Sequence, residues 1–185
     1  MIRLLAPALL SLALLPMPQA LAAADTVDGA ALYGHELRRL HSSESVDLRV
    51  AYAGRPMLVV NTASHCGYTG QFKGLEALHK RYQDAGLKVV GFPSNDFRQE
   101  ADDEAKTAEV CFINYGVSFD MFVPISVKGE SAHPIFRELA RQSSAPPRWN
   151  FHKYVIDREG RVVASFPSSV EPDDPALIAA IEKIL

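Results

Sequence analysis

The chain has 185 residues, 48% of them hydrophobic and 22% charged, which suits one globular domain with an adequate core. Its formal net charge is −3 at pH 7 and it has no basic tract, so we expect no nucleic-acid partner. It has two cysteines, Cys66 and Cys111. In an oxidising compartment such a pair would ordinarily form one structural disulfide.

The first 24 residues have the pattern of a cleaved secretory signal. Arg3 forms a basic start, residues 4–15 are largely apolar, and residues 20–24 offer small-residue cleavage sites. The apolar run is shorter than the roughly 20 residues needed to span a bilayer, which favours a signal over an uncleaved anchor. We therefore expect a mature domain at 25–185 without a membrane span, periplasmic in a bacterium or otherwise secreted.

Hydrophobic periodicity predicts alternating strands and helices after an N-terminal segment with short strands around residues 45–50. Strands are expected at 57–62 and 87–92, within 118–127, and as a hairpin of 154–157 with 162–166. Helices are expected at 69–84, from about 102 to 115, at 134–142 and at 176–185. This order fits a thioredoxin-like α/β domain, in which helices flank a central mixed sheet.

Cys66 lies in the predicted turn between the buried strand 57–62 and the following helix. Free amide N–H groups and the positive end of a helix dipole stabilise a thiolate there, and the thiolate is the nucleophile. Alternatively, Cys66 is a small buried structural residue, because free cysteine is among the most buried residue types. Thr69 stands where a Cys-x-x-Cys oxidoreductase would have its second cysteine, which counts against that class.

Four blocks of sequence, in the right order, resemble the glutathione peroxidase family over nearly the whole mature chain. They are Asn61-Thr-Ala-Ser-His-Cys66-Gly67, then Gly91-Phe-Pro-Ser-Asn-Asp-Phe-Arg-Gln99-Glu100, then Asn114-Tyr-Gly-Val-Ser-Phe119 with Ala132-His-Pro134, and finally Trp149-Asn-Phe151 with Asp157-Arg-Glu-Gly160. The resemblance implies a thioredoxin-like fold. It also implies a thiol-dependent peroxidase that reduces hydrogen peroxide and organic or lipid hydroperoxides.

The resemblance implies that Cys66 is the peroxidatic residue and that Gln99, Trp149 and Asn150 complete the catalytic site. A thiolate that attacks a peroxide bond needs donors that stabilise the sulfur and the departing oxygen, and amide and indole N–H groups supply them without charge. Taken singly, Trp149 could be a core aromatic, Asn150 a turn residue and Gln99 a solvated loop residue. The loop also departs from the family, whose Gly-Gly-Gln is shortened here to Arg98-Gln99.

Cys111 matches the resolving cysteine of the family's two-cysteine members. The resemblance therefore implies that a sulfenic acid at Cys66 condenses with Cys111, and that a thioredoxin-like donor, or glutathione, reduces the disulfide. Two alternatives remain: a redox relay that passes oxidation from Cys66 to a partner protein, and a non-catalytic domain with a static Cys66–Cys111 disulfide.

Neither the histidines nor the cysteines have the spacing of metal ligands, so we expect no metal and no cofactor. The segment 128–149 lacks the long insertion through which tetrameric members of the family assemble. The resemblance thus implies a monomer.

Overall fold

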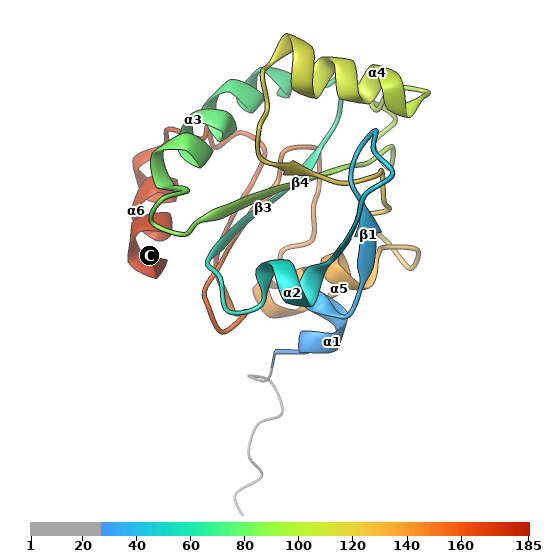
Figure 1. The fold of residues 1–185 in the computed structure, drawn as a ribbon. Coiled ribbons are helices and arrows are strands. Elements are labelled where there is room, and N and C mark those ends of the chain that lie inside the picture. Colours follow the sequence, from blue (N-terminus) through green and yellow to red (C-terminus); the bar gives the residue numbers. More distant parts are fainter. Residues whose placement is uncertain (1–26) are drawn as a thin grey trace, which may run out of the picture.

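The computed structural model describes residues 27–185, so the predicted signal peptide at 1–24 lies outside the described residues. A central five-stranded sheet carries helices on both faces (Figure 1). Its strands lie in the order β5 (Asp120–Met121), β4 (Lys88–Pro93), β3 (Met57–Thr62), β6 (Lys153–Ile156) and β7 (Val162–Phe166). The pairs β3–β4 and β4–β5 are parallel, whereas β3–β6 and β6–β7 are antiparallel. The predicted mixed α/β architecture is confirmed.

β3 is buried along its whole length because both faces of the sheet are covered. Leu58 and Val60 point into one core, and Val59 points into the other, as the alternation of side chains along a strand requires. The first core is covered by α3 (Phe72–Tyr82) and α6 (Pro175–Ile184), and the second by α5 (Pro134–Ser143) with two short N-terminal helices.

The helices begin where the sequence signals predict. Phe72, Leu75 and Leu78 form the buried stripe of α3, which follows a short 3₁₀ turn, η1 (Thr69–Gln71). Asp174 caps α6 by accepting the N–H of Ala176, with proline at the first helical position. Within residues 27–185, no helix has the length and apolar character required to cross a membrane.

The N-terminal segment is more regular than predicted. After α1 (Gly29–Tyr33), strands β1 (Glu36–Arg38) and β2 (Ser45–Asp47) pair antiparallel. The predicted strand around 45–50 ends at Asp47, because the Asp47 carboxylate accepts two amide hydrogens and starts α2 (Leu48–Tyr52).

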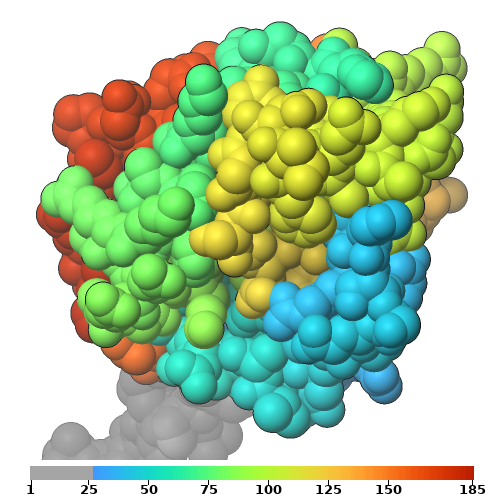
Figure 2. Space-filling model, turned by 45° about the horizontal axis from the view of Figure 1, so that its top comes forward, coloured from blue at the N-terminus to red at the C-terminus, as the bar shows by residue number. Residues whose placement is uncertain are grey.

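The predicted helix from 102 to 115 is present but changes its winding. It begins as α4 (Glu104–Ala108) and continues as a π-helix, η2 (Glu109–Asn114), which holds Cys111. The expected strand within 118–127 is reduced to β5. In Figure 2 the α4–η2 segment lies at the surface between α3 and the N-terminal hairpin of residues 36–47. An ion pair of 2.6 Å between Arg38 of the hairpin and Glu104 of α4 connects the two.

Candidate active site

Cys66 lies where the chain leaves β3 and enters η1, as predicted. Its side chain is 7% exposed, and the Tyr68 backbone N–H donates to the Cys66 Sγ at 3.4 Å. A donor from the first turn of a helix favours negative charge on the sulfur.

The Thr69 hydroxyl holds this turn together, which the sequence interpretation missed. It accepts the Cys66 N–H at 3.0 Å and lies 3.0 Å from the Ala63 carbonyl oxygen and 2.7 Å from that of Cys66. A threonine that bonds through its hydroxyl to backbone groups a few residues earlier is a local side-chain-to-backbone pattern that could have been recognised. Because the hydroxyl ties the residues on both sides of the sulfur, it limits how far the sulfur can move.

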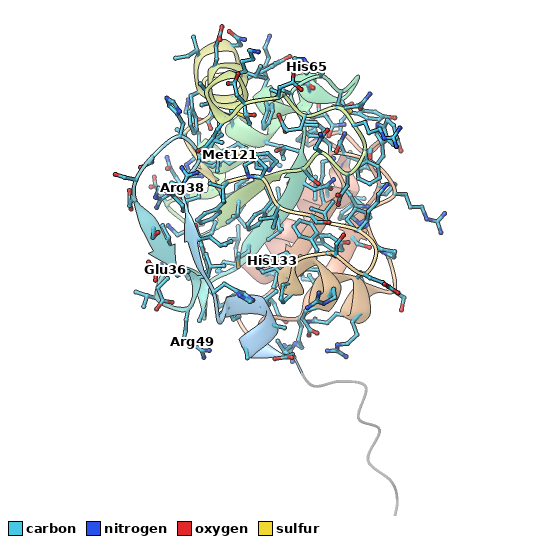
Figure 3. All side chains as sticks on the ribbon, turned by 90° about the vertical axis from the view of Figure 1, so that its right-hand side faces the viewer. Glu36, Arg38, Arg49, His65, Met121 and His133 are labelled. Carbon is cyan, nitrogen blue, oxygen red and sulfur yellow. The ribbon has the colours of Figure 1, made fainter. Side chains whose placement is uncertain are left out.

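The loop of Gln99 is fastened to the Cys66 turn by a backbone hydrogen bond. The His65 N–H donates to the Gln99 carbonyl oxygen at 2.9 Å, and Figure 3 shows His65 at the end of the molecule that also carries α4. Arg98 has a φ of 58°, in the left-handed region where the longer family loop has glycine. Its N–H closes a turn onto the Asn95 carbonyl at 2.9 Å. The shortened loop thus keeps Gln99 beside the Cys66 turn.

The Trp149–Asn150 turn is positioned by Asn61, at the end of β3. The Asn61 side chain donates to the Trp149 carbonyl oxygen at 3.1 Å and accepts the His152 N–H at 3.0 Å. The Trp149 ring, 40% exposed, packs on Phe97 with ring centroids 5.3 Å apart. The sequence motif included Asn61 without assigning it this role.

The structure brings Gln99 and Asn150 into direct contact. Asn150 is fully buried, and its Nδ2 donates to the Gln99 Oε1 at 3.3 Å. The Asn150 Oδ1 is buried without a hydrogen-bond partner among residues 27–185. A hollow of about 660 Å³ has Tyr68, Trp149 and His152 among its walls, whereas Cys66, Gln99 and Asn150 do not line it. The catalytic roles of these residues stay predictions.

Cys111 lies in a different element, buried to 1% exposure on the π-helix, and both cysteines are free thiols. Burial, and secondarily the charge of Glu100, raises the pKa of the Cys111 thiol to about 12. Cys111 is therefore a protonated, unreactive thiol in this conformation.

Glu100 connects the two cysteine-bearing segments, a second contact that the sequence interpretation missed. Its Oε1 accepts the Ser64 hydroxyl from the Cys66 turn and, at 3.0 Å, the Thr107 hydroxyl from α4. It also accepts the Ala101 N–H at 2.8 Å. The carboxylate thus links the start of the Cys111 helix to the Cys66 turn.

The sequence is similar to proteins of one known family. The family model described as "Glutathione peroxidase" matches residues 32–140, more than half of the chain. A "Glutathione peroxidase" of Lactococcus lactis is 44% identical over 128 residues, which is 66% of this chain and 82% of that protein. The "Hydroperoxy fatty acid reductase gpx1" of Synechocystis is 41% identical over 165 residues, covering 83% of this chain and 95% of that protein.

Solved structures agree with this assignment. The crystal structure of Trgpx in its apo form has a TM-score of 0.62 at 30% identity, covering 82% of this chain and 96% of that one. Mycobacterium tuberculosis DsbF has a TM-score of 0.59 at 13% identity over 84% of this chain and 98% of that one, which shows the thioredoxin-like fold alone. By sequence and structure together, this chain belongs to the glutathione peroxidase family and is a thiol peroxidase that reduces hydroperoxides.

Proposed function

We propose that Cys66 is the peroxidatic cysteine and that Gln99, Trp149 and Asn150 serve its reaction. The observation that carries this proposal is the convergence of three segments at the end of β3. The Cys66 turn bonds to the Gln99 loop, the loop bonds to Asn150, and Asn61 holds the Trp149–Asn150 turn.

In the proposed reaction the Cys66 thiolate attacks one peroxide oxygen and the O–O bond breaks. The other oxygen leaves as water or an alcohol after taking up a proton, and Cys66 becomes a sulfenic acid. The unpartnered Oδ1 of Asn150 is suited to accept the hydroperoxide hydroxyl. The Gln99 Nε2 and the Trp149 indole N–H, which have no acceptor among residues 27–185, are suited to stabilise the departing oxygen.

Cys111 then resolves the sulfenic acid in our proposal. Its sulfur attacks Cys66, water leaves, and a Cys66–Cys111 disulfide forms. Because Cys111 is buried on a helix, the η2 segment must open first. Three of the six η2 residues are exposed, Ile113 to 78%, which supports local opening, whereas Val110, Cys111 and Phe112 pack against the core and must be released when the segment opens.

A thioredoxin-like dithiol is the proposed reductant, and it returns two electrons and two protons to the disulfide. A disulfide between two protein cysteines is a substrate for dithiol exchange, which favours such a donor over glutathione. Hydrogen peroxide and organic or lipid hydroperoxides are the proposed substrates, and the printed name of the Synechocystis relative supports a fatty-acid hydroperoxide among them.

The test measures peroxide consumption with either thioredoxin or glutathione as the only reductant. Turnover should be faster with thioredoxin, and Cys66→Ser should abolish it with both. Cys111→Ser should abolish thioredoxin-driven turnover, while mass spectrometry still finds one oxidised Cys66 per chain after a single peroxide addition. Normal turnover of Cys111→Ser with thioredoxin would show that Cys111 is not the resolving residue.

A redox relay is the second candidate, since the relay also begins with peroxide attack at Cys66. In that case Cys111→Ser should accumulate mixed disulfides with a specific partner protein, rather than with thioredoxin, after exposure of cells to peroxide. The free thiols of both cysteines count against the static-disulfide alternative.

Export and the monomeric state also belong to the proposal. The signal-like pattern of residues 1–24 supports a periplasmic or secreted protein. N-terminal sequencing of the exported protein should find a start between residues 23 and 25, and light scattering should give the mass of one chain. An uncleaved N-terminus in the cytoplasm would refute the export proposal.

A further inference from the structure

Lys153 is a charged residue buried completely within the core. It lies at the start of β6, and its side chain has 0% exposure. Its Nζ donates to the Gln71 Oε1 at 2.6 Å and to the Phe151 carbonyl oxygen at 2.8 Å. No carboxylate within residues 27–185 pairs with it directly. Burying a cation is costly even when it is hydrogen-bonded, so a leucine or methionine would serve the core better.

The Gln71 contact leads to the Cys66 side of the site. Gln71 ends η1, the short helix that begins just after Cys66, and it is 3% exposed. Its Nε2 donates to the Ser168 carbonyl at 2.7 Å and to the Glu171 carboxylate at 3.1 Å. Because the amide nitrogen is engaged there, the amide oxygen is held facing Lys153.

The Phe151 contact leads to the other side of the site. Phe151 directly follows Asn150 and has a φ of 64°, a left-handed conformation that a phenylalanine rarely adopts. Its N–H donates to the Asn61 carbonyl oxygen at 2.6 Å, and its own carbonyl oxygen accepts from Lys153. The strained residue is therefore tied on both sides, by Asn61 and by Lys153.

We propose that Lys153 is a positioning residue of the peroxidase. Its ammonium group clamps the Trp149–Phe151 turn to the start of α3, and so holds Trp149 and Asn150 beside the Cys66 turn. The residue does not touch the reacting atoms. This inference rests on the proposed roles of Trp149 and Asn150, and it adds the group that keeps them in place.

The charge of the clamp depends on pH. Burial lowers the pKa of Lys153 to about 8, although the nearby Glu171 carboxylate opposes this shift. His152 is the other titratable neighbour, and burial lowers its pKa to about 4, so it stays neutral from pH 6 upward. The ammonium group is therefore present below about pH 8, and above it the clamp weakens because a neutral amine is a poorer donor.

Trp149 provides a direct readout, since it is the only tryptophan in the chain. Lys153→Met keeps the length of the side chain but removes its charge and its donors. We expect peroxide consumption to fall by about tenfold or more, together with a red shift of Trp149 emission and easier quenching by acrylamide. Removing the buried charge favours folding, whereas leaving the Gln71 Oε1 and the Phe151 carbonyl oxygen without a donor opposes it, so the urea midpoint serves as the check that the variant is folded. Lys73→Met, on the exposed face of α3, is the matched control and should change none of these.

A pH titration separates the clamp from a merely structural lysine. In the wild type, Trp149 emission should titrate with a midpoint near pH 8, and activity should decline with it. Glu171→Gln removes a charge that raises the pKa of Lys153, so the midpoint should move to lower pH.

The proposal would be overturned if the Trp149 emission of Lys153→Met were the same as in the wild type, whether its activity were normal or lost. Altered emission with normal activity would refute the roles of Trp149 and Asn150, and the positioning role with them. If Lys153→Met fails to fold, an unshifted midpoint in Glu171→Gln overturns the proposal.

Discussion

Gly91 on β4 packs directly against the Met121 side chain on β5. It lies opposite Met121 in the strand register, and a Cβ atom added there would be 2.2 Å from the Met121 Sδ and 3.3 Å from the Phe119 ring. Overpacking a buried site costs about 1–3 kcal/mol. Gly91→Ala is therefore expected to lower the free energy of unfolding by that amount, as measured by urea denaturation.

Gly70 offers the control for this substitution. A Cβ atom there would meet nothing within 4 Å, and the residue lies in the helical turn η1. Gly70→Ala should leave stability unchanged or raise it by up to about 1 kcal/mol. Equal losses in the two variants would contradict the close approach of Gly91 and Met121.

Short sequence motifs identified the residues predicted for the site. They did not reveal the roles of Asn61 and Lys153, whose hydrogen bonds hold those residues in place. Gln99 and Asn150 were predicted separately, and the structure joins them with a hydrogen bond. The contacts of Asn61 with the Trp149 carbonyl and of Lys153 with Gln71 join residues more than 80 positions apart. Such partners follow from the pairing of β3 with β6, which no local pattern specifies.

At the scale of elements, the change of winding before Cys111 is the feature that the sequence did not predict. Acidic residues at the start and alanines along the segment correctly indicated a helix. A pattern of apolar residues indicates a helical face. It cannot show whether each backbone N–H bonds to the carbonyl four residues earlier, as in an α-helix, or five residues earlier, as in a π-helix. The hydrogen bond from the Tyr115 N–H to the Val110 carbonyl, at 3.2 Å, spans five residues and is of the π-helical type.

The η2 segment determines which thiol reacts in the reduced protein. Burial and Glu100 raise the pKa of Cys111 to about 12, so this thiol stays protonated at neutral pH and is inaccessible as well. Iodoacetamide at pH 7.5, followed by peptide mass spectrometry, should modify Cys66 at least about tenfold faster than Cys111. In urea the two rates should become similar. Comparable rates in the folded protein would mean that η2 is open before any oxidation.

For the whole molecule, one buried histidine, His152, and one partly buried histidine, His133, predict a loss of stability in mild acid. Burial, aided by a neighbouring positive charge, lowers the pKa of His133 and of His152 to about 4. In the unfolded chain the pKa is about 6.5, so the unfolded state binds more protons between these values. The free energy of unfolding should therefore decrease as the pH falls from about 6.5 to about 4, by about 5 kcal/mol for the two histidines together. Urea unfolding at pH 7 and at pH 4.5 measures this decrease in the free energy of unfolding.

A double variant isolates these histidines from the carboxylates. His133→Asn keeps a side chain that can cap α5, and His152→Phe keeps an aromatic ring beside Tyr154. The double variant should lose clearly less stability than the wild type between the two pH values. The same loss in both proteins would assign the acid sensitivity to other groups.

The overall architecture was predictable because buried strands and amphipathic helices alternate clearly from Met57 onward. The N-terminal segment was less predictable from the sequence, because its short strands and helices are stabilised by contacts with residues far away in the chain. Arg39, for example, forms an isolated bridge with Phe122 and an ion pair with Asp120. These contacts extend the β5 side of the sheet, and nothing near Arg39 in the sequence indicates them.

The two edges of the sheet bear on how the protein avoids aggregation. At one edge, β5 is only two residues long, and the chain beyond it is covered by the Arg39–Phe122 bridge. At the other edge, the Gln142 side chain on α5 accepts the Val162 N–H at 2.8 Å and donates to the Gly160 carbonyl at 3.1 Å. Free edge amides are what a strand from another copy would bind. The sheet edges are therefore protected from strand-to-strand association, and this protection does not depend on η2, the segment whose opening we propose for the oxidised protein.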